Sequence, residues 1–274
     1  MGDQHSDGHP ADGETPVHGV TLSAFEIDAT SVTNADFAVF VDDTGYLTES
    51  ERQGFSAVFH LAFEGSDADI LGAVEAAPWW YGVRGADWRH PGGPSSTIDG
   101  RMDHPVVQVS WDDAQAYCDW AGRALPTEAQ WERAARGGVE GERYPWGDDL
   151  PARELGTDWP CNIFQGRFPN KNTVKDGFLT TAPVRTFAPN GFGLWQMVGN
   201  VWEWCRDYFD PGYYAASPTT DPQGPATGAG RVMRGGSYLC HDSYCNRYRV
   251  AARTSNTSDS AAGNLGFRVA FDPR

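Results

Sequence analysis

The sequence predicts a loop-rich fold with a few short helices followed by short strands, and it excludes a sheet in which strands and helices alternate. The chain of 274 residues contains 32 glycines and 18 prolines, which interrupt regular elements. It also contains 11 tryptophans, so we expect a core built mainly from large aromatic side chains. A chain of this length can bury a sizeable core as one large domain or as two of modest size.

Three short helices are predicted in the first half of the chain. Residues 34–44 form an amphipathic stretch that a glycine ends. Ser110 and Asp113 form a capping box that opens a second helix through Ala121, and Thr127 with Gln130 opens a third that ends before Gly137. The side chains expected to face inward are Phe37, Phe40 and Val41, then Ala114, Tyr117, Cys118 and Ala121, then Trp131, Ala134 and Ala135.

Beyond Gly137 the sequence predicts mostly loops, with short strands at residues 232–234, 248–252 and 267–271. We find no internal repeat. Residues 1–15 combine acidic residues with glycine, histidine and proline. Such a composition predicts a flexible N-terminal segment without a function of its own.

The formal net charge of the chain is −16 at pH 7, because 37 acidic residues outnumber 21 basic ones. This charge argues against binding to nucleic acid phosphates or to an anionic membrane surface. No apolar run is long enough to span a bilayer, and the N-terminus lacks the basic and apolar regions of a secretion signal. We therefore expect a cytoplasmic monomer.

Residues 234–249, R-G-G-S-Y-L-C-H-D-S-Y-C-N-R-Y-R, set two thiols beside a hydroxyl, an imidazole and phenols. Cys240 and Cys245 cannot converge on a regular helix or strand, so a loop must bring them together. Gly235 and Gly236 allow close backbone approach before that loop, and the alternation in residues 247–250 predicts a strand after it.

Four interpretations of the two thiols are open. A structural disulfide is the simplest, although a reducing compartment disfavours it. Structural zinc requires four ligands, and only His241 and Asp242 are at hand. A redox-active dithiol and a Cu(I) site remain, since two thiolates can hold Cu(I) with few other ligands. The other cysteines, Cys118, Cys161 and Cys205, are expected to be buried apolar thiols.

The same stretch, with Asn264-Leu-Gly-Phe-Arg268 downstream, closely resembles the active-site region of the formylglycine-generating enzymes, also called sulfatase-modifying factors. The resemblance covers about residues 16–271. Further motifs occur in that family's order: A-P-W-W at 77–80, H-P-V at 104–106, V-S-W at 109–111, L-P-T-E at 125–128, P-W-G at 145–147 and G-N-V-W-E-W at 199–204. The resemblance implies a single mixed α+β domain over residues 16–274, with a C-type-lectin-like core and little regular structure. Relatives begin with a strand that ends in Met-Gly, so at Met1-Gly2 we expect that strand to be missing or replaced.

The resemblance also implies an activity, the conversion of the cysteine in a Cys-x-Pro-x-Arg segment of a sulfatase into Cα-formylglycine using O2. By resemblance, Cys240 and Cys245 bind Cu(I), which can pass an electron to O2 where closed-shell thiols react poorly. Ser237 would position or activate oxygen, and Trp202 and Tyr244 would line the oxygen side. We expect Asn264 to contact substrate. His241 is as consistent with a hydrogen-bonded loop residue as with a proton shuttle, and Arg249 and Arg253 are consistent with structural ion pairs.

Two structural calcium sites are implied in the same way. The first takes side-chain oxygens from Asn162 and Asp176 and carbonyls from Ile163 and Phe178. The second takes carbonyls from Gly199 and Val201 and the carboxylate of Glu203, with Gln196 where relatives often have Asn. The simpler alternative is that these side chains only hydrogen-bond their own loops.

Two other functions remain alternatives. A non-catalytic relative could keep the fold as a binding module, which loss of either active-site cysteine would favour, and both are present. An iron-dependent oxidase of the same fold would need a facial set of histidines and a carboxylate. Among the seven histidines only His5 and His9 are closely spaced, four residues apart in the N-terminal segment.

Overall fold

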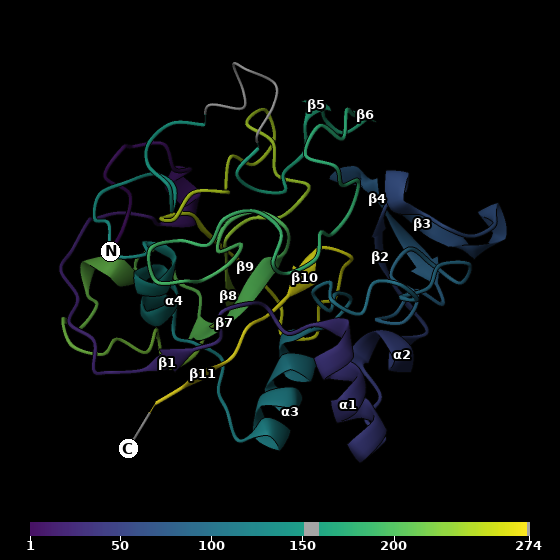
Figure 1. The fold of residues 1–274 in the computed structure, drawn as a ribbon, viewed down its shortest axis with the longest axis horizontal. Helices are drawn as coiled ribbons and strands as arrows, with labels where there is room; N and C mark the ends of the chain where they lie inside the picture. Colours follow the sequence, from purple (N-terminus) through teal and green to yellow (C-terminus); the bar gives the residue numbers. More distant parts are fainter. Residues whose placement is uncertain (151–158, 273–274) are drawn as a thin grey trace.

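A four-stranded sheet lies at the centre of the structure, a computed structural model that describes residues 1–150 and 159–272 (Figure 1). Its strand order is β10-β7-β8-β9, and only the β10–β7 pair is parallel. The strands are β7 (Trp202–Tyr208), β8 (Arg231–Arg234), β9 (Arg253–Asn256) and β10 (Leu265–Gly266). All four come from the C-terminal third of the chain, which also contains the predicted dithiol loop.

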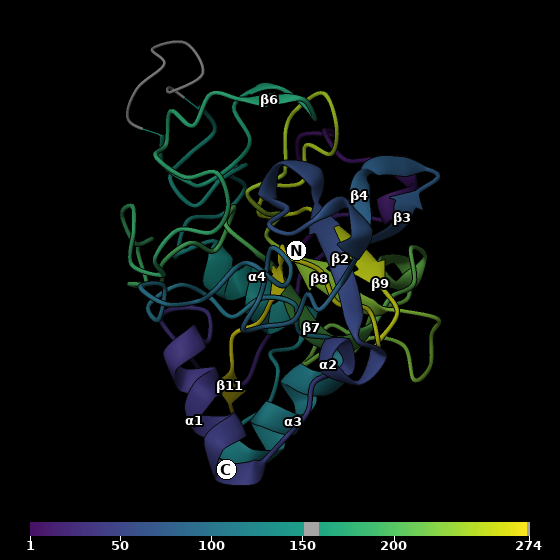
Figure 2. The ribbon, with the colours of Figure 1, turned by 90° about the vertical axis from the view of Figure 1, so that its right-hand side faces the viewer.

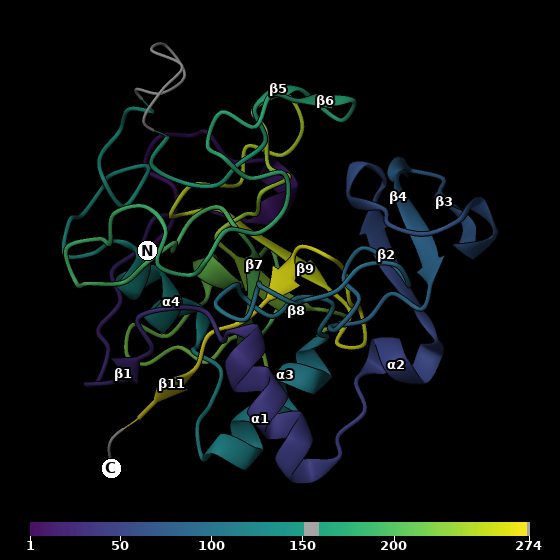
Figure 3. The same cartoon turned by 45° about the vertical axis from the view of Figure 1, so that its right-hand side comes forward.

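A second sheet, which the sequence did not predict, lies beside the central one (Figures 1 and 3). It is antiparallel, in the order β2-β4-β3, and a bridge between Ala57 and Ala262 links it to the loop before β10. Its strands are β2 (Phe55–Phe59), β3 (Ile70–Val74) and β4 (Ala77–Arg84). Two smaller pairs join β1 (Glu26–Ile27) to β11 (Ala270–Phe271) and β5 (Gly166–Arg167) to β6 (Lys171–Asn172).

The three predicted helices are confirmed; the second and third have the expected capping boxes, and the first has one as well, formed by Thr33 and Asp36. They are α1 (Asn34–Thr44), α3 (Trp111–Ala121) and α4 (Glu128–Ala135), with a short additional α2 (Glu49–Gln53) and 3-10 turns at Pro10–Asp12, His60–Ala62, Asp67–Asp69 and Tyr213–Ala215. Figure 2 shows α1 and α3 converging below the sheets. The predicted inward residues are buried except Ala121, which is exposed at the end of α3. None of the helices in the described ranges is both long and apolar enough for a membrane span.

Aromatic side chains fill the core between these helices and the central sheet, as predicted. Phe37 of α1 packs edge-to-face on Trp88, with ring centroids 5.2 Å apart. Tyr117 of α3 packs in the same way on Phe267, at 5.3 Å. Edge-to-face contacts of this kind add to the free energy gained by burying the rings.

Two of the three predicted strands differ in the structure. Residues 248–252 form no strand, because the carbonyls of Val250 and Ala251 accept hydrogen bonds from the guanidinium of Arg234 instead of from a neighbouring strand. The segment 267–271 is strand only at its end, in β11, since Arg268 turns into the core to pair with Glu203. The prediction at 232–234 is confirmed by β8.

The N-terminal segment, predicted to be flexible, is instead packed against the domain. Asp3, Asp12 and Glu14 are buried. The backbone amide of Gly2 donates to Glu132 of α4 at 3.0 Å, and Arg249 donates to both carboxylate oxygens of Glu14. Residues 1–15 therefore belong to the folded unit.

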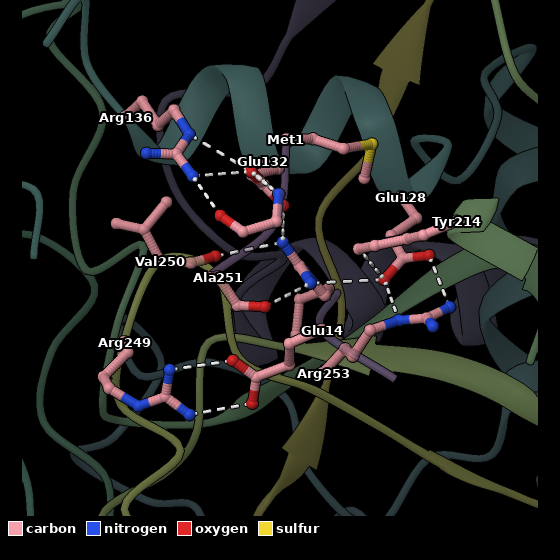
Figure 4. A network of polar contacts seen from close by, with 12 residues as sticks. Met1, Glu14, Glu128, Glu132, Arg136, Tyr214, Arg249, Val250, Ala251 and Arg253 are labelled. Atoms are coloured by element: carbon pink, nitrogen blue, oxygen red, sulfur yellow. Dashed lines mark hydrogen bonds and ion pairs between the residues drawn. The ribbon is translucent and has the colours of Figure 1, made fainter. Parts of the chain in front are cut away.

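A buried network of ion pairs joins α4 to the central sheet (Figure 4). Glu128 accepts hydrogen bonds from Arg253 at 2.7 and 2.9 Å and from Arg234 at 3.2 Å. Glu132 accepts from Arg234 at 2.5 Å and from Arg136 at 2.7 Å. The two glutamates and both sheet arginines are almost fully buried, so each charge depends on the others for compensation.

Asp207 lies at the edge of this network. Its carboxylate accepts a hydrogen bond from the backbone amide of Glu128 at 2.8 Å. Burial, with a further contribution from the charge of Glu128, raises the pKa of Asp207 to about 7. In the unfolded chain an aspartate titrates near pH ~3.9.

We therefore predict that the contribution of Asp207 to the free energy of unfolding becomes less favourable as the pH rises towards 7. Between about pH 4 and pH 7 the unfolded state has lost the proton that the folded state keeps, so the free energy of unfolding falls by up to about 1.4 kcal/mol per pH unit. In Asp207→Asn the amide oxygen can still accept the hydrogen bond from Glu128, but the side chain no longer ionises. In urea unfolding, its stability relative to the parent should rise from pH 4 to pH 7 and then level off. The exposed Asp99→Asn is the control, and a pH-independent difference for Asp207→Asn would contradict the prediction.

Candidate active site

One cavity of about 380 Å³ brings together the six side chains predicted for the chemistry. We call it the dithiol cavity. The predicted residues that line it are Trp202, Ser237, Cys240, Tyr244, Cys245 and Asn264. They come from the start of β7, from the loop between β8 and β9, and from the loop before β10. The central sheet therefore positions all of them.

The two cysteines meet because the loop that carries them closes on itself. Gly236 has φ +71°, and a Cβ there would lie 2.7 Å from the carbonyl oxygen of Arg247, so a side chain would keep the two ends of the loop apart. The Cα atoms of Cys240 and Cys245 are 5.6 Å apart, and their Sγ atoms are joined as a disulfide. The loop thus brings the two sulfurs together, as the sequence predicted, with the pair in its oxidised form.

The pair fits Cu(I) only after reduction. A disulfide offers no thiolate, and two electrons and two protons convert it to the dithiol form. Both sulfurs are then held on one short loop with soft donor character, which suits Cu(I). Among the residues that the structure describes, no group of three or more His, Cys, Asp or Glu side chains could hold a metal ion.

Ser237 is buried at the wall of the cavity, in the loop after β8 and not on the strand itself. Its Oγ accepts hydrogen bonds from the side-chain amide of Asn264 at 3.0 Å and from the backbone amide of Leu239 at 3.3 Å. These two bonds occupy both lone pairs of the hydroxyl, so its proton remains to be donated. Asn264 therefore orients Ser237, besides lining the cavity as predicted for a substrate contact.

Tyr244 belongs to an aromatic wall on one side of the cavity. Its ring stacks on Phe168 at 4.2 Å and 8°, and Trp79 packs on it edge-to-face at 5.0 Å. Tyr244 remains 40% exposed, so the wall reaches solvent. The motif A-P-W-W, noted in the sequence only as a resemblance, supplies both Trp79 and the cavity residue Trp80.

Three residues of uncertain role are now placed. His241 does not line the dithiol cavity; it faces a separate cavity of about 290 Å³, and its Nδ1 lies 2.8 Å from Ser243 Oγ. The structure thus favours a hydrogen-bonded loop histidine over a proton shuttle. Arg249 and Arg253 are bound to Glu14 and Glu128, which confirms structural ion pairs.

The first predicted calcium loop has the features of a cation site. Asn162 Oδ1 and Asp176 Oδ2 are both buried without a hydrogen-bond partner. Burial raises the pKa of the Asp176 carboxyl, and its hydrogen bonds to the backbone amides of Phe178 and Ile163 only partly offset this. Buried oxygens normally have partners, so two that lack them in the predicted ligand set fit a bound cation.

The second predicted calcium site does not fit as proposed. Both carboxylate oxygens of Glu203 are already used, by Arg268 at 2.7 and 2.8 Å, by Trp131 at 2.7 Å and by Ser31 at 2.8 Å. A carboxylate neutralised by a buried guanidinium is a poor calcium ligand. Gln196 Oε1 is buried without a hydrogen-bond partner. The negative charge predicted for this site, that of Glu203, is already neutralised by Arg268.

The remaining cysteines are buried, as predicted. Burial raises the pKa of the Cys118 thiol to about 12, and it raises the pKa values of Cys161 and Cys205 as well. These thiols are therefore protonated and unreactive at neutral pH.

The fold and the dithiol cavity together have the features of a sulfatase-modifying factor domain. The family model described as the sulfatase-modifying factor enzyme 1-like domain matches residues 1–273, and the chain belongs to this family. It is 65% identical over 272 residues to the formylglycine-generating enzyme of Streptomyces coelicolor, covering 99% of this chain and 86% of that protein. It is 54% identical to the formylglycine-generating enzyme of Thermomonospora curvata, covering 100% of this chain and 90% of that protein.

A solved structure supports the fold. PvdO from Pseudomonas aeruginosa superimposes with a TM-score of 0.71 at 22% identity, covering 100% of this chain and 90% of the other. At this identity the likeness concerns the fold alone, and it confirms the predicted α+β architecture of this family.

Arg247 is a cavity residue that was not predicted from the sequence. Its side chain lines the dithiol cavity, together with Val74 of β3. The alternation of Arg247, Tyr248 and Arg249 predicted a strand, in which both arginines would point to the same face. In the structure the two arginines instead have different partners.

The first cation loop leads to a prediction about calcium. If the cation binds only the folded state, calcium should raise the melting temperature of chelator-treated protein by several degrees. Asp176→Asn removes the carboxylate charge and should abolish that increase, as measured by differential scanning calorimetry, whereas the exposed Asp99→Asn should preserve it. Identical melting curves of the parent with calcium and with chelator would refute the site.

Proposed function

We propose that this protein is a formylglycine-generating enzyme, which oxidises the cysteine of a Cys-x-Pro-x-Arg segment in a sulfatase to Cα-formylglycine with O2. The observation that carries the proposal is the single cavity in which Cys240 and Cys245 lie beside Ser237 and Trp202. The relatives named formylglycine-generating enzyme, at 65% and 54% identity over nearly the whole chain, support it.

The reaction must balance in electrons. Converting a CH2–SH group and O2 into an aldehyde, hydrogen sulfide and water consumes two further electrons and two protons. A small thiol reductant could supply them and would also reduce the Cys240–Cys245 disulfide, which the dithiol form requires. Cu(I), held by the two thiolates, would supply the single-electron reactivity towards O2 that thiols lack.

The residues of the cavity have distinct tasks in this proposal. The Ser237 hydroxyl proton is not donated to any acceptor among the residues that the structure describes. The hydrogen bonds from Asn264 and Leu239 fix the direction of the hydroxyl. A hydroxyl fixed in this way can donate to oxygen as negative charge develops on it. Trp202 and Tyr244 line the cavity and help to exclude water from the reacting groups.

The backbone of the cation loop supports the dithiol directly. The amide of Phe164, next to the predicted calcium ligand Ile163, donates to the carbonyl of Cys240 at 3.1 Å. Asn162 also donates to Asn200, whose carbonyl accepts the amide of Tyr238 at 2.9 Å. A cation at Asn162 and Asp176 would therefore help to hold both ends of the segment that carries Ser237 and Cys240.

The overall proposal is tested by incubating the reduced, copper-loaded protein with a Cys-x-Pro-x-Arg peptide in air and following the peptide by mass spectrometry. Conversion of the thiol to the aldehyde supports an enzyme. Binding of the peptide without conversion would favour a non-catalytic binding module.

The metal assignment gives a second prediction. The reduced protein should bind one Cu(I) tightly, because two thiolates are available on one loop. Cys240→Ser and Cys245→Ser should each weaken this binding by orders of magnitude in competition with a Cu(I) chelator. Cys118→Ala, which removes a thiol outside the cavity, should bind copper like the parent. Undiminished copper affinity in both serine variants would exclude the assignment.

The role of Ser237 gives a third prediction. Ser237→Ala removes the free hydroxyl proton but leaves both cysteines, so turnover should fall by about 10²-fold or more, while the affinity for a peptide carrying Ser in place of Cys stays near the parental value. Single-turnover assays at defined oxygen concentration and calorimetric titration measure the two effects. Parental turnover in this variant would remove Ser237 from the catalytic machinery.

A further inference from the structure

The N-terminal segment carries two carboxylates that hold two arginines directly after the dithiol loop. Asp12 accepts hydrogen bonds from Arg247 Nε at 2.6 Å and Nη2 at 3.0 Å. Glu14 accepts from Arg249 Nη1 and Nη2, each at 2.8 Å (Figure 4). Bidentate pairs of this kind fix both the position and the plane of a guanidinium.

The two arginines differ in whether a guanidinium N–H donor remains free to bind another molecule. Arg249 is only 3% exposed, and its Nε also donates, to the carbonyl of Asn246 at 2.9 Å, so each of its guanidinium nitrogens is engaged. Arg247 has a side chain that is 23% exposed and that lines the dithiol cavity. Its Nη1 has no hydrogen-bond partner within residues 1–150 and 159–272. A structural role therefore accounts for Arg249 but leaves part of Arg247 unexplained.

We propose that Arg247 is a substrate-binding residue of the dithiol cavity: Nη1 donates a hydrogen bond to a main-chain carbonyl of the client polypeptide, and Asp12 is the positioning residue that holds the guanidinium for this contact. The assignment rests on the proposed function, since it concerns how the same cavity holds its polypeptide substrate. It gives the acidic N-terminal segment a part in substrate binding.

The chemistry of the client favours a carbonyl as the acceptor. A guanidinium has donors only, so its partner must be an acceptor. The fixed positions of Cys-x-Pro-x-Arg include no carboxylate, whereas each residue of an extended polypeptide offers a main-chain carbonyl. The proline lacks an N–H, which leaves the segment with more main-chain acceptors than donors. The guanidinium of Arg247, which can only donate, is therefore suited to bind one of the excess main-chain carbonyls.

The pair with Asp12 also explains why an arginine can serve here. An unpaired guanidinium would repel the arginine of an approaching client, and its long side chain would lose conformational freedom on binding. Asp12 compensates most of the charge and holds the side chain in place before the client arrives. The orientation is thus set in the free protein.

Calorimetric titration of the reduced protein with a Ser-x-Pro-x-Arg peptide tests the assignment. Arg247→Gln should raise the Kd about 10-fold, the effect of losing one charge-assisted hydrogen bond. Asp12→Asn should raise it less, about three-fold, and the double variant should be no worse than Arg247→Gln alone, because Asp12 acts through Arg247. With the cysteine peptide, kcat/KM should fall by a similar factor, through KM more than kcat.

The matched control is Glu14→Gln, which weakens the neighbouring ion pair. It should lower the melting temperature and leave the peptide Kd unchanged. If Arg247→Gln lowers the melting temperature but binds the peptide like the parent, Arg247 is structural and the assignment is overturned while the proposed function stands. A parent protein that neither binds nor converts the peptide would overturn the proposed function, and this assignment with it.

Discussion

The rest of the structure depends on one constraint, the mutual compensation of charges buried between α4 and the central sheet. Arg234 and Arg253 are fully buried, and Glu128 is their shared partner. Leaving any one of these charges without its partner would cost several kcal/mol, so α4, β8 and β9 must assemble together. Arg234 ends β8 immediately before Gly235 and also binds the carbonyls of Val250 and Ala251. The same network therefore fixes both ends of the dithiol loop, which carries the proposed catalytic residues.

The sequence predicted those features whose causes are local. Capping boxes and amphipathic spacing identified three helices, because the interacting groups lie within four residues of one another. The candidate site residues were taken from family motifs, and the structure brings six of them to one cavity. The strand expected at residues 248–252 failed because its carbonyls bind a side chain 16 and 17 residues away. Period-two alternation cannot reveal such a competitor.

Long-range partners also explain the misassigned charges. Glu203 was expected to bind calcium, yet Arg268, 65 residues away, neutralises it. The first calcium site stays a prediction, and the unpartnered oxygens of Asn162 and Asp176 are consistent with it. The backbone amide of Phe164 in the loop of that site donates a hydrogen bond to the carbonyl of Cys240, so the loop and the wall of the dithiol cavity are directly connected. Loosening the loop would be expected to disturb both.

The ion pairs of Asp12 and Glu14 span 235 residues, nearly the whole chain, and this has a consequence for biosynthesis. During translation the first segment leaves the ribosome long before Arg247 and Arg249 are made, so Asp12 and Glu14 lack these partners until then. Contacts of such high order form late and slowly. The wall of the cavity is thus completed only after residues 247–264 have been made, so a nascent chain cannot display a complete site before this segment has left the ribosome.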